Sequence, residues 1–516
     1  MAAGSGRDRI LGDEMLLKTI VLSPVMAVAF LTLGGCGSMR PQALTMEETT
    51  ARAVSDKKFI DDHYVPLNGP LSLSEAIARS LKYNYDAQLS KTEANLQERQ
   101  LDLAFSQMLP RLAAGAGYDG RNNYNASQSI DVKTQTQSLQ YSYSQQPQYT
   151  SADLTLTWNA LDLGISYFGA KQQGFRALIA VERRRKVIDN IARTTANAYW
   201  RAASAAQLLP KIDPMLKTAR EILTVSRAVS AQNLQSPLAL LDFQQNMVIV
   251  LSELERIHND LTAAHIELAS LINIPSDSTL SFTTAPDTLE PQQGIDNHRL
   301  EMVGLALRPE LRIEQYQQKI DQQDVYKEII KMLPGVGIVS GLNYNSNNLL
   351  YQNTWSEVGV RATFNLFNLI QGPLAIKVAQ GAVDLSEQRR LALSVAVLSQ
   401  VNLAVQDYAN SLESYKTAQE VDRVGEQIGR VANDVSLAGA QSEADRIRRQ
   451  LTVLTTRIQR DKAQIKVLGS LASIYSATGM DLVPAGAEMQ DLPTLTAQVE
   501  RAVSRWQNGQ LPELSQ

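Results

Sequence analysis

Met108-Leu109-Pro110 and Met332-Leu333-Pro334 are two copies of one tripeptide, and both end a long helical pattern and begin an alternating, strand-like one. Aligning the two prolines gives an offset of 224 residues (334 − 110). Farther along, the offset falls to 206, which pairs Thr157-Trp158-Asn159 with Thr363-Phe364-Asn365. The chain is therefore an internal duplication whose first copy carries 18 extra residues (224 − 206) between its strands. A duplication spaced this widely predicts a symmetric scaffold.

The sequence pattern of each copy predicts two strands flanked by helices. In the first copy, a helical pattern over 72–109 precedes an alternation in which Leu154 and Trp158 share one face. The second copy repeats this order, with Val358 and Val360 on the apolar face. The chain therefore offers four strands, each with one apolar face.

The predicted helices carry seams of apolar residues. The longest seam spaces its positions alternately 3 and 4 residues apart, which is typical of left-handed helix packing. It lies in a helical pattern from about Lys171 to Val229, roughly 90 Å long at 1.5 Å per residue. Its members are Ile188, Ile191, Thr195, Ala198, Ala202, Ala205, Leu209, Ile212, Leu216, Ala219 and Leu223. The returning segment carries a second seam of Met247, Leu251, Leu254, His258, Leu261, His265, Leu268 and Ile272.

The only cysteine, Cys36, follows a predicted secretory signal. The apolar run from Thr19 to Leu33 is too short to span a membrane and stay there. Leu33-Gly34-Gly35-Cys36 resembles a bacterial lipobox, which predicts that Cys36 is lipidated and becomes the mature N-terminus. Gly37 at the following position favours the outer membrane over the inner membrane.

The domain organisation that these patterns predict has six parts. They are a lipoprotein signal peptide over 1–35, an extended N-terminal arm over 36–71, a first repeat over 72–275 with strands at about 111–164, a linker over 276–298, a second repeat over 299–480 with strands at about 335–368, and a C-terminal tail over 481–516. Met1 and Met15 are both possible translation starts, and the acidic pair before Met15 favours the second.

Composition and charge narrow the class of function. Aromatic residues make up only 6% of the chain, and the remaining mix suits long helices with seams of small residues. The 49 basic and 53 acidic residues give a net charge of −4. A nucleic-acid partner would normally require a basic stripe, so none is expected. With a single cysteine, a disulfide within the chain is impossible.

Two physical arguments predict a symmetric oligomer. Four strands in a bilayer leave two unpaired edges, and in lipid each unpaired backbone group costs several kcal/mol. Outer-membrane barrels close with at least about eight strands. Helices of roughly 90 Å likewise need neighbours along their whole length. Further copies of the same chain are therefore expected to complete the barrel.

The duplicated helix–strand–strand–helix order, the Leu-Pro junctions and the lipobox resemble the TolC-type family of outer-membrane efflux proteins, and more specifically its lipoprotein branch. The resemblance covers about residues 72–480. It implies a mostly α fold with transmembrane β-strands, in which each chain is an internally duplicated protomer of a trimeric 12-strand β-barrel on a long periplasmic α-helical barrel. It also implies a homotrimer in contact with outer-membrane lipid. The implied partners are a periplasmic adaptor (membrane fusion) protein and an inner-membrane transporter.

The turn between the two long helical patterns of the second copy reads Gly439-Ala440-Gln441-Ser442-Glu443-Ala444-Asp445. The resemblance implies that an aspartate six residues after such a glycine lines the periplasmic entrance. Asp445 is therefore the main gate candidate, together with its neighbours Ser442 and Glu443. Arg448 stands where the family's best-known member has a second aspartate. Like charges at a narrow mouth repel one another and favour cations, and the alternative is that these are solvated helix-end charges.

Two motifs that suggest other chemistry have simpler explanations. The run from Gly115 to Gly120 matches G-x-G-x-x-G, but no helix follows it as a dinucleotide site requires. Glycines of a curved barrel strand explain it better. His258 and His265 lie about 10 Å apart along a helix, too far for one zinc ion, and predict a polar layer in the seam. The sequence offers no nucleophile–base set and no phosphate loop, so we expect no enzymatic activity, no cofactor and no metal.

These patterns favour a passive exit duct, the outer-membrane channel of a tripartite export system that expels small molecules such as drugs or toxic compounds. An alternative with the same fold is the outlet of a type I protein secretion system. A non-conducting structural lipoprotein with a coiled-coil stalk is a further alternative, but a stalk does not need strand pairs with one apolar face.

Overall fold

A computed structural model describes residues 43–231, 237–283, 296–437, 443–481, 483, 486 and 490–507. The chain divides into two units, Met1–Tyr64 and Val65–Gln516. Cys36 and Ser442, two of the predicted site residues, lie outside the described residues.

In the first unit, helix α2 (Met46–Asp62) occupies part of the arm that we predicted to be extended. The Thr45 side chain accepts a hydrogen bond from the Glu48 N–H, and the Glu48 carboxylate accepts one from the Thr45 N–H. This reciprocal cap satisfies two amides that a helix start leaves without partners. The prediction was wrong for these residues because local capping, rather than burial, defines the helix, which has no buried residue.

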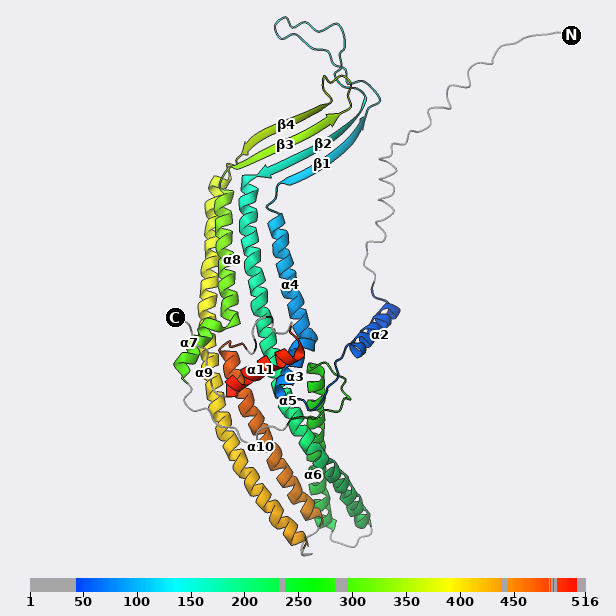
Figure 1. The fold of residues 1–516 in the computed structure, drawn as a ribbon, viewed down its shortest axis with the longest axis vertical. Coiled ribbons are helices and arrows are strands. Elements are labelled where there is room, and N and C mark those ends of the chain that lie inside the picture. The colour runs from blue at the N-terminus through cyan, green and yellow to red at the C-terminus, as the bar shows by residue number, and fades with distance from the viewer. Residues whose placement is uncertain are drawn as a thin grey trace, which may run out of the picture. The chain divides into compact units, whose positions relative to one another are not determined.

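The second unit repeats one order of elements (Figure 1). The first copy consists of α3 (Leu73–Tyr83), α4 (Tyr85–Ser106), β1 (Arg111–Gly120), β2 (Gln148–Asn159), α5 (Ala160–Ala231) and α6 (Pro237–Leu271). The second copy consists of α7 (Asn297–Leu307), α8 (Pro309–Lys331), β3 (Gly335–Asn345), β4 (Thr354–Thr363), α9 (Asn368–Leu437) and α10 (Glu443–Ala477). Helix α11 (Leu492–Gln507) follows. The predicted order of helices around two strands is therefore present in both copies.

The long helices α5 and α9 each pack against shorter helices (Figure 1). Near the sheet, α4, α5, α8 and α9 lie side by side in that order. Away from the sheet, α6 packs on α5, and α10 packs on both α5 and α9. Helix α4 and helix α9 therefore border opposite edges of the helical layer.

The seam that we predicted along α5 is confirmed. Nine of its eleven members are buried, and the other two, Ile188 and Leu209, are half-buried. Ile212 lies in one apolar cluster with Leu254 of α6 and Leu454 of α10. Full burial of such a side chain stabilises a fold by about 1.5–3 kcal/mol. The seam therefore holds the helices of both copies together below the sheet.

The seam that we predicted along α6 is confirmed at five of its eight positions: Met247, Leu254, Leu261, Leu268 and Ile272 are buried. The other three, Leu251, His258 and His265, are only half-buried, and their neighbours Val250, Ile257 and Ala264 are buried instead. Both sets have a spacing of seven residues, so the period alone does not choose between neighbouring positions. An imidazole is costly to bury without a hydrogen-bond partner. The predicted polar layer inside the seam is therefore wrong, and the histidines lie at its border.

The predicted continuous helix of the first copy is broken at Asn84, and the second copy is broken 224 residues later at Arg308. Both residues have extended backbone, with φ/ψ of −67°/131° and −56°/124°. Asn84 accepts from the Asp86 N–H and donates from Nδ2 to the Leu271 carbonyl, 3.4 Å away at the end of α6. Arg308 precedes Pro309, and a residue before proline is driven out of the helical region. Each break thus ends one helix and begins the next.

Arg308 joins the break of the second copy to the end of α10. Its Nη1 donates to the carbonyls of Ser476 and Ala477 at 3.2 Å each, and its Nε pairs with Glu310 at 3.0 Å. Gly479 follows with a φ of 67°, and a Cβ there would lie 2.8 Å from the backbone of Arg308. Only glycine fits this close approach without strain.

Asp189 of α5 lies against the same junction. Its Oδ2 accepts a hydrogen bond from the Ser476 hydroxyl at 2.6 Å. Burial raises the pKa of the Asp189 carboxyl, and the Ser476 hydrogen bond and the charge of Arg193 offset only part of this effect. The junction therefore brings together α5, the α7–α8 break and the end of α10.

Part of the predicted C-terminal tail is helix α11, which packs on the first copy. Leu495 and Val499 of this helix are buried in one cluster with Ile77 and Leu81 of α3. Apolar residues at a helical spacing on one face explain why the helix is held there.

Candidate functional site

The four strands form one antiparallel sheet in the order β1-β2-β3-β4. Within the described chain, β1 and β4 pair on one side only and so form its two edges. Because the strands alternate in direction, β1 runs antiparallel to β4. The β4 edge of one chain therefore has the direction that an antiparallel ladder with β1 of another chain requires.

One face of the sheet carries no charged residue. Val358 and Val360 of β4 are 75% and 72% exposed on this face. Strand register places the following apolar residues there with them: Leu112, Ala114, Ala116, Tyr118, Ala152, Leu154, Leu156, Trp158, Val336, Ile338, Leu342, Tyr344 and Ala362. The polar residues of this face are uncharged: Gln148, Thr150, Ser340, Thr354 and Ser356. An exposed apolar surface of this kind marks a site of interaction with lipid or with another protein.

All charged residues of the four strands lie on the opposite face: Arg111, Asp119, Asp153, Glu357 and Arg361. Glycines gather there as well. A Cβ at Gly115 would lie 2.3 Å from Oδ1 of Asp153, its partner across the β1–β2 ladder. The G-x-G-x-x-G match over 115–120 therefore lies within strand β1, as predicted, and the glycine leaves room for a carboxylate.

Aromatic residues mark both ends of the apolar face. Trp158 lies at the end that continues into α5, and Tyr118 and Tyr344 lie near the opposite end. Tyr118 pairs with Thr150, eight residues before Trp158 along β2, which corresponds to about 26 Å at 3.3 Å per residue. Aromatic girdles at the two borders of an apolar band of about 25 Å are typical of outer-membrane strands.

The two bordering helices also expose apolar stripes. Leu89, Leu96 and Leu103 of α4 recur every seven residues and are exposed. Leu374 and Val378 of α9 are exposed at the other edge. Helix packing normally covers such stripes. The helical layer and the sheet therefore have matching unpaired edges on the same two sides.

The predicted gate residues lie at the start of α10. Glu443 is its first residue, and Asp445 and Arg448 fall within its first two turns. The structure describes only the backbone of these residues, and the acidic ring stays a prediction. Among the residues that the structure describes, no helix combines the length and the hydropathy that a membrane-spanning helix needs.

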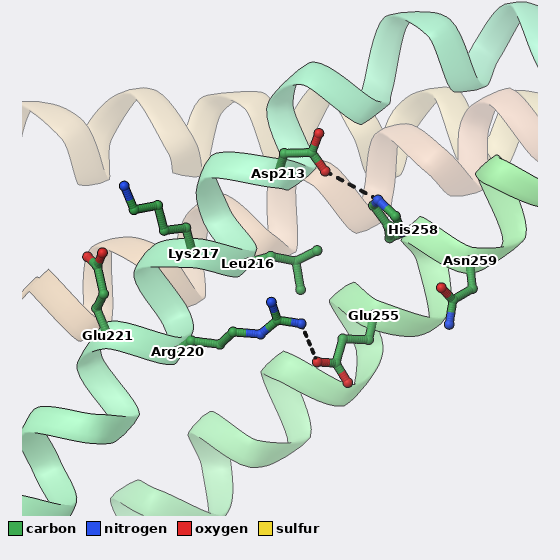
Figure 2. A pocket seen from close by; sticks show the side chains of 8 residues that line it. All are labelled: Asp213, Leu216, Lys217, Arg220, Glu221, Glu255, His258 and Asn259. Carbon is green, nitrogen blue, oxygen red and sulfur yellow. Dashed lines mark hydrogen bonds and ion pairs between the residues drawn. The ribbon is translucent and has the colours of Figure 1, made fainter. Parts of the chain in front are cut away.

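A groove of about 580 Å³ lies between α5 and α6 and is lined mostly by charged residues (Figure 2). One ion pair and one histidine–carboxylate contact cross from one helix to the other. Arg220 Nη2 lies 2.8 Å from Glu255 Oε1, and His258 Nε2 lies 3.4 Å from Asp213 Oδ1. The lining contains no serine, threonine, cysteine or tyrosine that such a pair would activate. These contacts join the helices, and His258 takes part in them from the border of the seam.

The protein resembles known proteins in its three-dimensional structure, whereas its sequence matches none of the family models or curated proteins. The Campylobacter jejuni CmeC outer membrane channel is 13% identical, with a TM-score of 0.61 over 84% of this chain and 89% of that chain. The open-state Neisseria gonorrhoeae MtrE outer membrane channel is 15% identical, with a TM-score of 0.58 over 79% and 88%. The Vibrio cholerae outer membrane protein VceC is 14% identical, with a TM-score of 0.57 over 79% and 96%.

This chain therefore has the fold of the TolC-type outer-membrane channels, as the sequence predicted. The match spans most of both chains, so the sheet and the long helices belong to one shared architecture. The breaks at Asn84 and Arg308 were not predicted from the sequence, although the Arg308-Pro309 dipeptide is a signal for the second.

Proposed function

We propose that the protein is the outer-membrane channel of a tripartite export system, a passive exit duct for small molecules such as drugs or toxic compounds. The observation that carries this proposal is the charge-free apolar face that spans all four strands, with every strand charge on the opposite face. Lipid outside and water inside explain this division. The role needs no catalytic group.

In this proposal, three copies close a barrel of twelve strands. Each β4 edge pairs with β1 of the next copy, so the interface is head-to-tail and the ring closes without free edges. The stripe on α4, which includes Leu96, then meets the stripe on α9, which includes Val378. A closed ring removes the unpaired backbone groups that a single chain would expose to lipid.

The partners follow from the same role. We propose a periplasmic adaptor and an inner-membrane transporter that deliver cargo to the end of the duct distant from the sheet. We also propose that Cys36 is lipidated and anchors the chain in the outer membrane. A single acyl chain holds a protein only marginally, so the barrel supplies most of the attachment.

The entrance is proposed to lie at the turn before α10. Three copies of Asp445 would form an acidic ring that attracts cations, and the three carboxylates would repel one another when the entrance narrows. Glu443 and Ser442 lie beside it in sequence, and Arg448 one turn later weakens the cation preference. The support for this arrangement is the position of Asp445 six residues after Gly439.

Neighbouring residues on opposite faces of β4 provide the test. Val358→Arg places a charge on the apolar face, and Gly359→Arg places the same charge on the polar face, where a Cβ meets nothing within 4 Å. An arginine facing the middle of a bilayer costs about 2–4 kcal/mol. We expect Val358→Arg to lose assembly into the outer membrane and Gly359→Arg to keep it, as measured by membrane fractionation. Equal assembly of both variants would refute a lipid-facing apolar surface.

A further inference from the structure

The connection from β1 to β2 extends well beyond the sheet as an arm, defined here as residues 122–143. Two antiparallel bridges, Ser127 with Ser142 and Ile130 with Gln137, hold its two sides together. The rings of Tyr124 and Tyr143 contact one another at its base, with centroids 4.6 Å apart. The arm lies at the end of the sheet farthest from the helices (Figure 1). It contains the insertion that distinguishes the first copy from the second.

The root of the arm is fixed by the β3–β4 loop of the same chain. Asn347 is only 3% exposed, and its Oδ1 accepts from the Gln146 N–H at 3.1 Å while its Nδ2 donates to the Ser144 carbonyl at 3.0 Å. The Asn348 N–H donates to the Gln146 side chain at 3.1 Å. A buried and satisfied amide is costly to displace. The arm therefore leaves the sheet in a direction that its own chain sets.

The arm exposes aliphatic side chains at its free end and along its returning side. Val132, in the turn at the free end, is 86% exposed, and Leu139, behind the Ile130–Gln137 bridge, is 98% exposed. The only charged residues of the arm are Asp131 and Lys133, and Asp131 Oδ1 accepts from the backbone N–H of Lys133 and Thr134 at 2.9 Å each. The tip thus presents one aliphatic group, one acid and one base, with a second aliphatic group farther back on the arm. This surface is complementary to a second copy of itself.

The arm is long enough to reach the axis of the barrel. From Gly120 to Asp131 the chain spans about 36 Å at 3.3 Å per residue. Twelve strands about 4.8 Å apart and tilted by about 40° form a barrel about 24 Å across. The radius of about 12 Å is therefore well within the reach of each arm.

We propose that the arms of three copies meet on the three-fold axis over the outer mouth of the barrel. The Val132 side chains of the three copies bury one another there, and Lys133 of each copy faces Asp131 of the next. The inference rests on the proposed trimeric channel and adds to it a closure at the exit. Lipid is a poorer partner because the arm begins beyond the level of Tyr118 and Tyr344, which mark the border of the apolar band.

Position on a symmetry axis gives a direct test, because only residues near the axis meet their own copies. We expect Val132→Cys to form disulfide-linked dimers within the trimer on mild oxidation. A disulfide requires Cα atoms no more than about 6.8 Å apart. Tyr351→Cys is the matched control: this residue is 99% exposed on the β3–β4 loop, and copies at a rim of about 12 Å radius lie about 20 Å apart. It should form none.

The outcomes separate this inference from the channel itself. If the protein is a trimer and Val132→Cys forms no more disulfide-linked dimer than Tyr351→Cys, the proposed closure of the outer mouth by the arms is wrong. The proposed channel is not affected by that result. A protein that is not trimeric overturns both. A second measurement tests the charge pairing. Lys133→Glu places the new carboxylate of each copy beside Asp131 of the next copy, and the repulsion should separate the three arms and open the outer mouth of the barrel. Labelling of Thr157→Cys on the polar face by an impermeant, polymer-linked maleimide on intact cells should then rise about tenfold, and an unchanged rate contradicts the proposed closure.

Discussion

Arg308→Ala tests whether the break in the second copy is a fixed joint between α8 and α10. The two copies provide an internal control, because the helix ends are equivalent at an offset of 206. Thr478, Gly479 and Met480 donate to the carbonyls of Ile474, Ser476 and Tyr475, and in the first copy Ile272, Asn273 and Ile274 donate to those of Leu268, Ser270 and Ala269. The backbone hydrogen bonds at the two helix ends are therefore equivalent, but the side chain that contacts each helix end differs: Arg308 in the second copy and Asn84 in the first.

The magnitude follows from the bonds that each side chain makes. Arg308→Ala removes four hydrogen bonds of a largely buried guanidinium, to Glu310, to the exposed Gln400 side chain, and to the carbonyls of Ser476 and Ala477, of which the last two join it to the end of α10. A hydrogen bond to a charged group contributes about 1.5–3 kcal/mol, and these two share one nitrogen, so we expect a loss of about 2–3 kcal/mol. Asn84→Ala removes one long hydrogen bond and a helix cap, together about 1 kcal/mol.

Amide hydrogen exchange reports these losses locally, without requiring reversible unfolding of the whole protein. At about 1.4 kcal/mol for each factor of ten, Arg308→Ala should speed exchange at Thr478, Gly479 and Met480 about 30- to 100-fold. Exchange at Ile272 and Asn273 should not change. The reasoning is refuted if the end of α10 exchanges at the wild-type rate, or if both helix ends are affected equally.

Three further predictions concern other parts of the chain. Cys36→Ser should abolish acylation detected by mass spectrometry, and an unmodified wild-type Cys36 would contradict the lipobox. Asp445→Ala should lower cation selectivity and Arg448→Ala should raise it, as measured by reversal potential under a salt gradient, whereas no change in either would mean that the tip charges are merely solvated. Because burial raises the pKa of Asp189 above its unfolded value of 3.8, the folded protein holds a proton that the unfolded chain releases, and stability is lost as pH rises through the folded pKa. The melting temperature of Asp189→Asn, relative to that of the wild type, should therefore rise as the pH is raised from 4 to 7. A difference between the two melting temperatures that stays constant over this pH range would contradict the prediction.

The strands and the α5 seam were predictable because each rests on a regular period. Alternation identified the face shared by Leu154 and Trp158, and 3-and-4 spacing identified the buried residues around Ile212. Both patterns persist over many positions, so a single exception does not obscure them. Assembly with further copies of the chain stays a prediction, because one chain shows that the β1 and β4 edges are unpaired but not what covers them.

Features that depend on one residue or on exact rotation were missed. The break at Asn84 leaves the helical period on both sides intact, so periodicity gives no sign of it. His258 lies one position from Ile257, and spacing alone does not choose which of them faces the core. The signal for α2 was available, since Thr45 and Glu48 form a capping box in the sequence. A polar helix without a buried face gives no periodic signal to reinforce such a cap.

The most direct test of the account is the mass of the protein extracted from outer membranes in detergent, measured by native mass spectrometry. The unpaired β1 and β4 edges require further copies of the chain, and the proposed twelve-strand barrel, at four strands for each chain, requires three. A complex of three would support a twelve-strand barrel. A monomer, or a complex of any other number of copies, would contradict it.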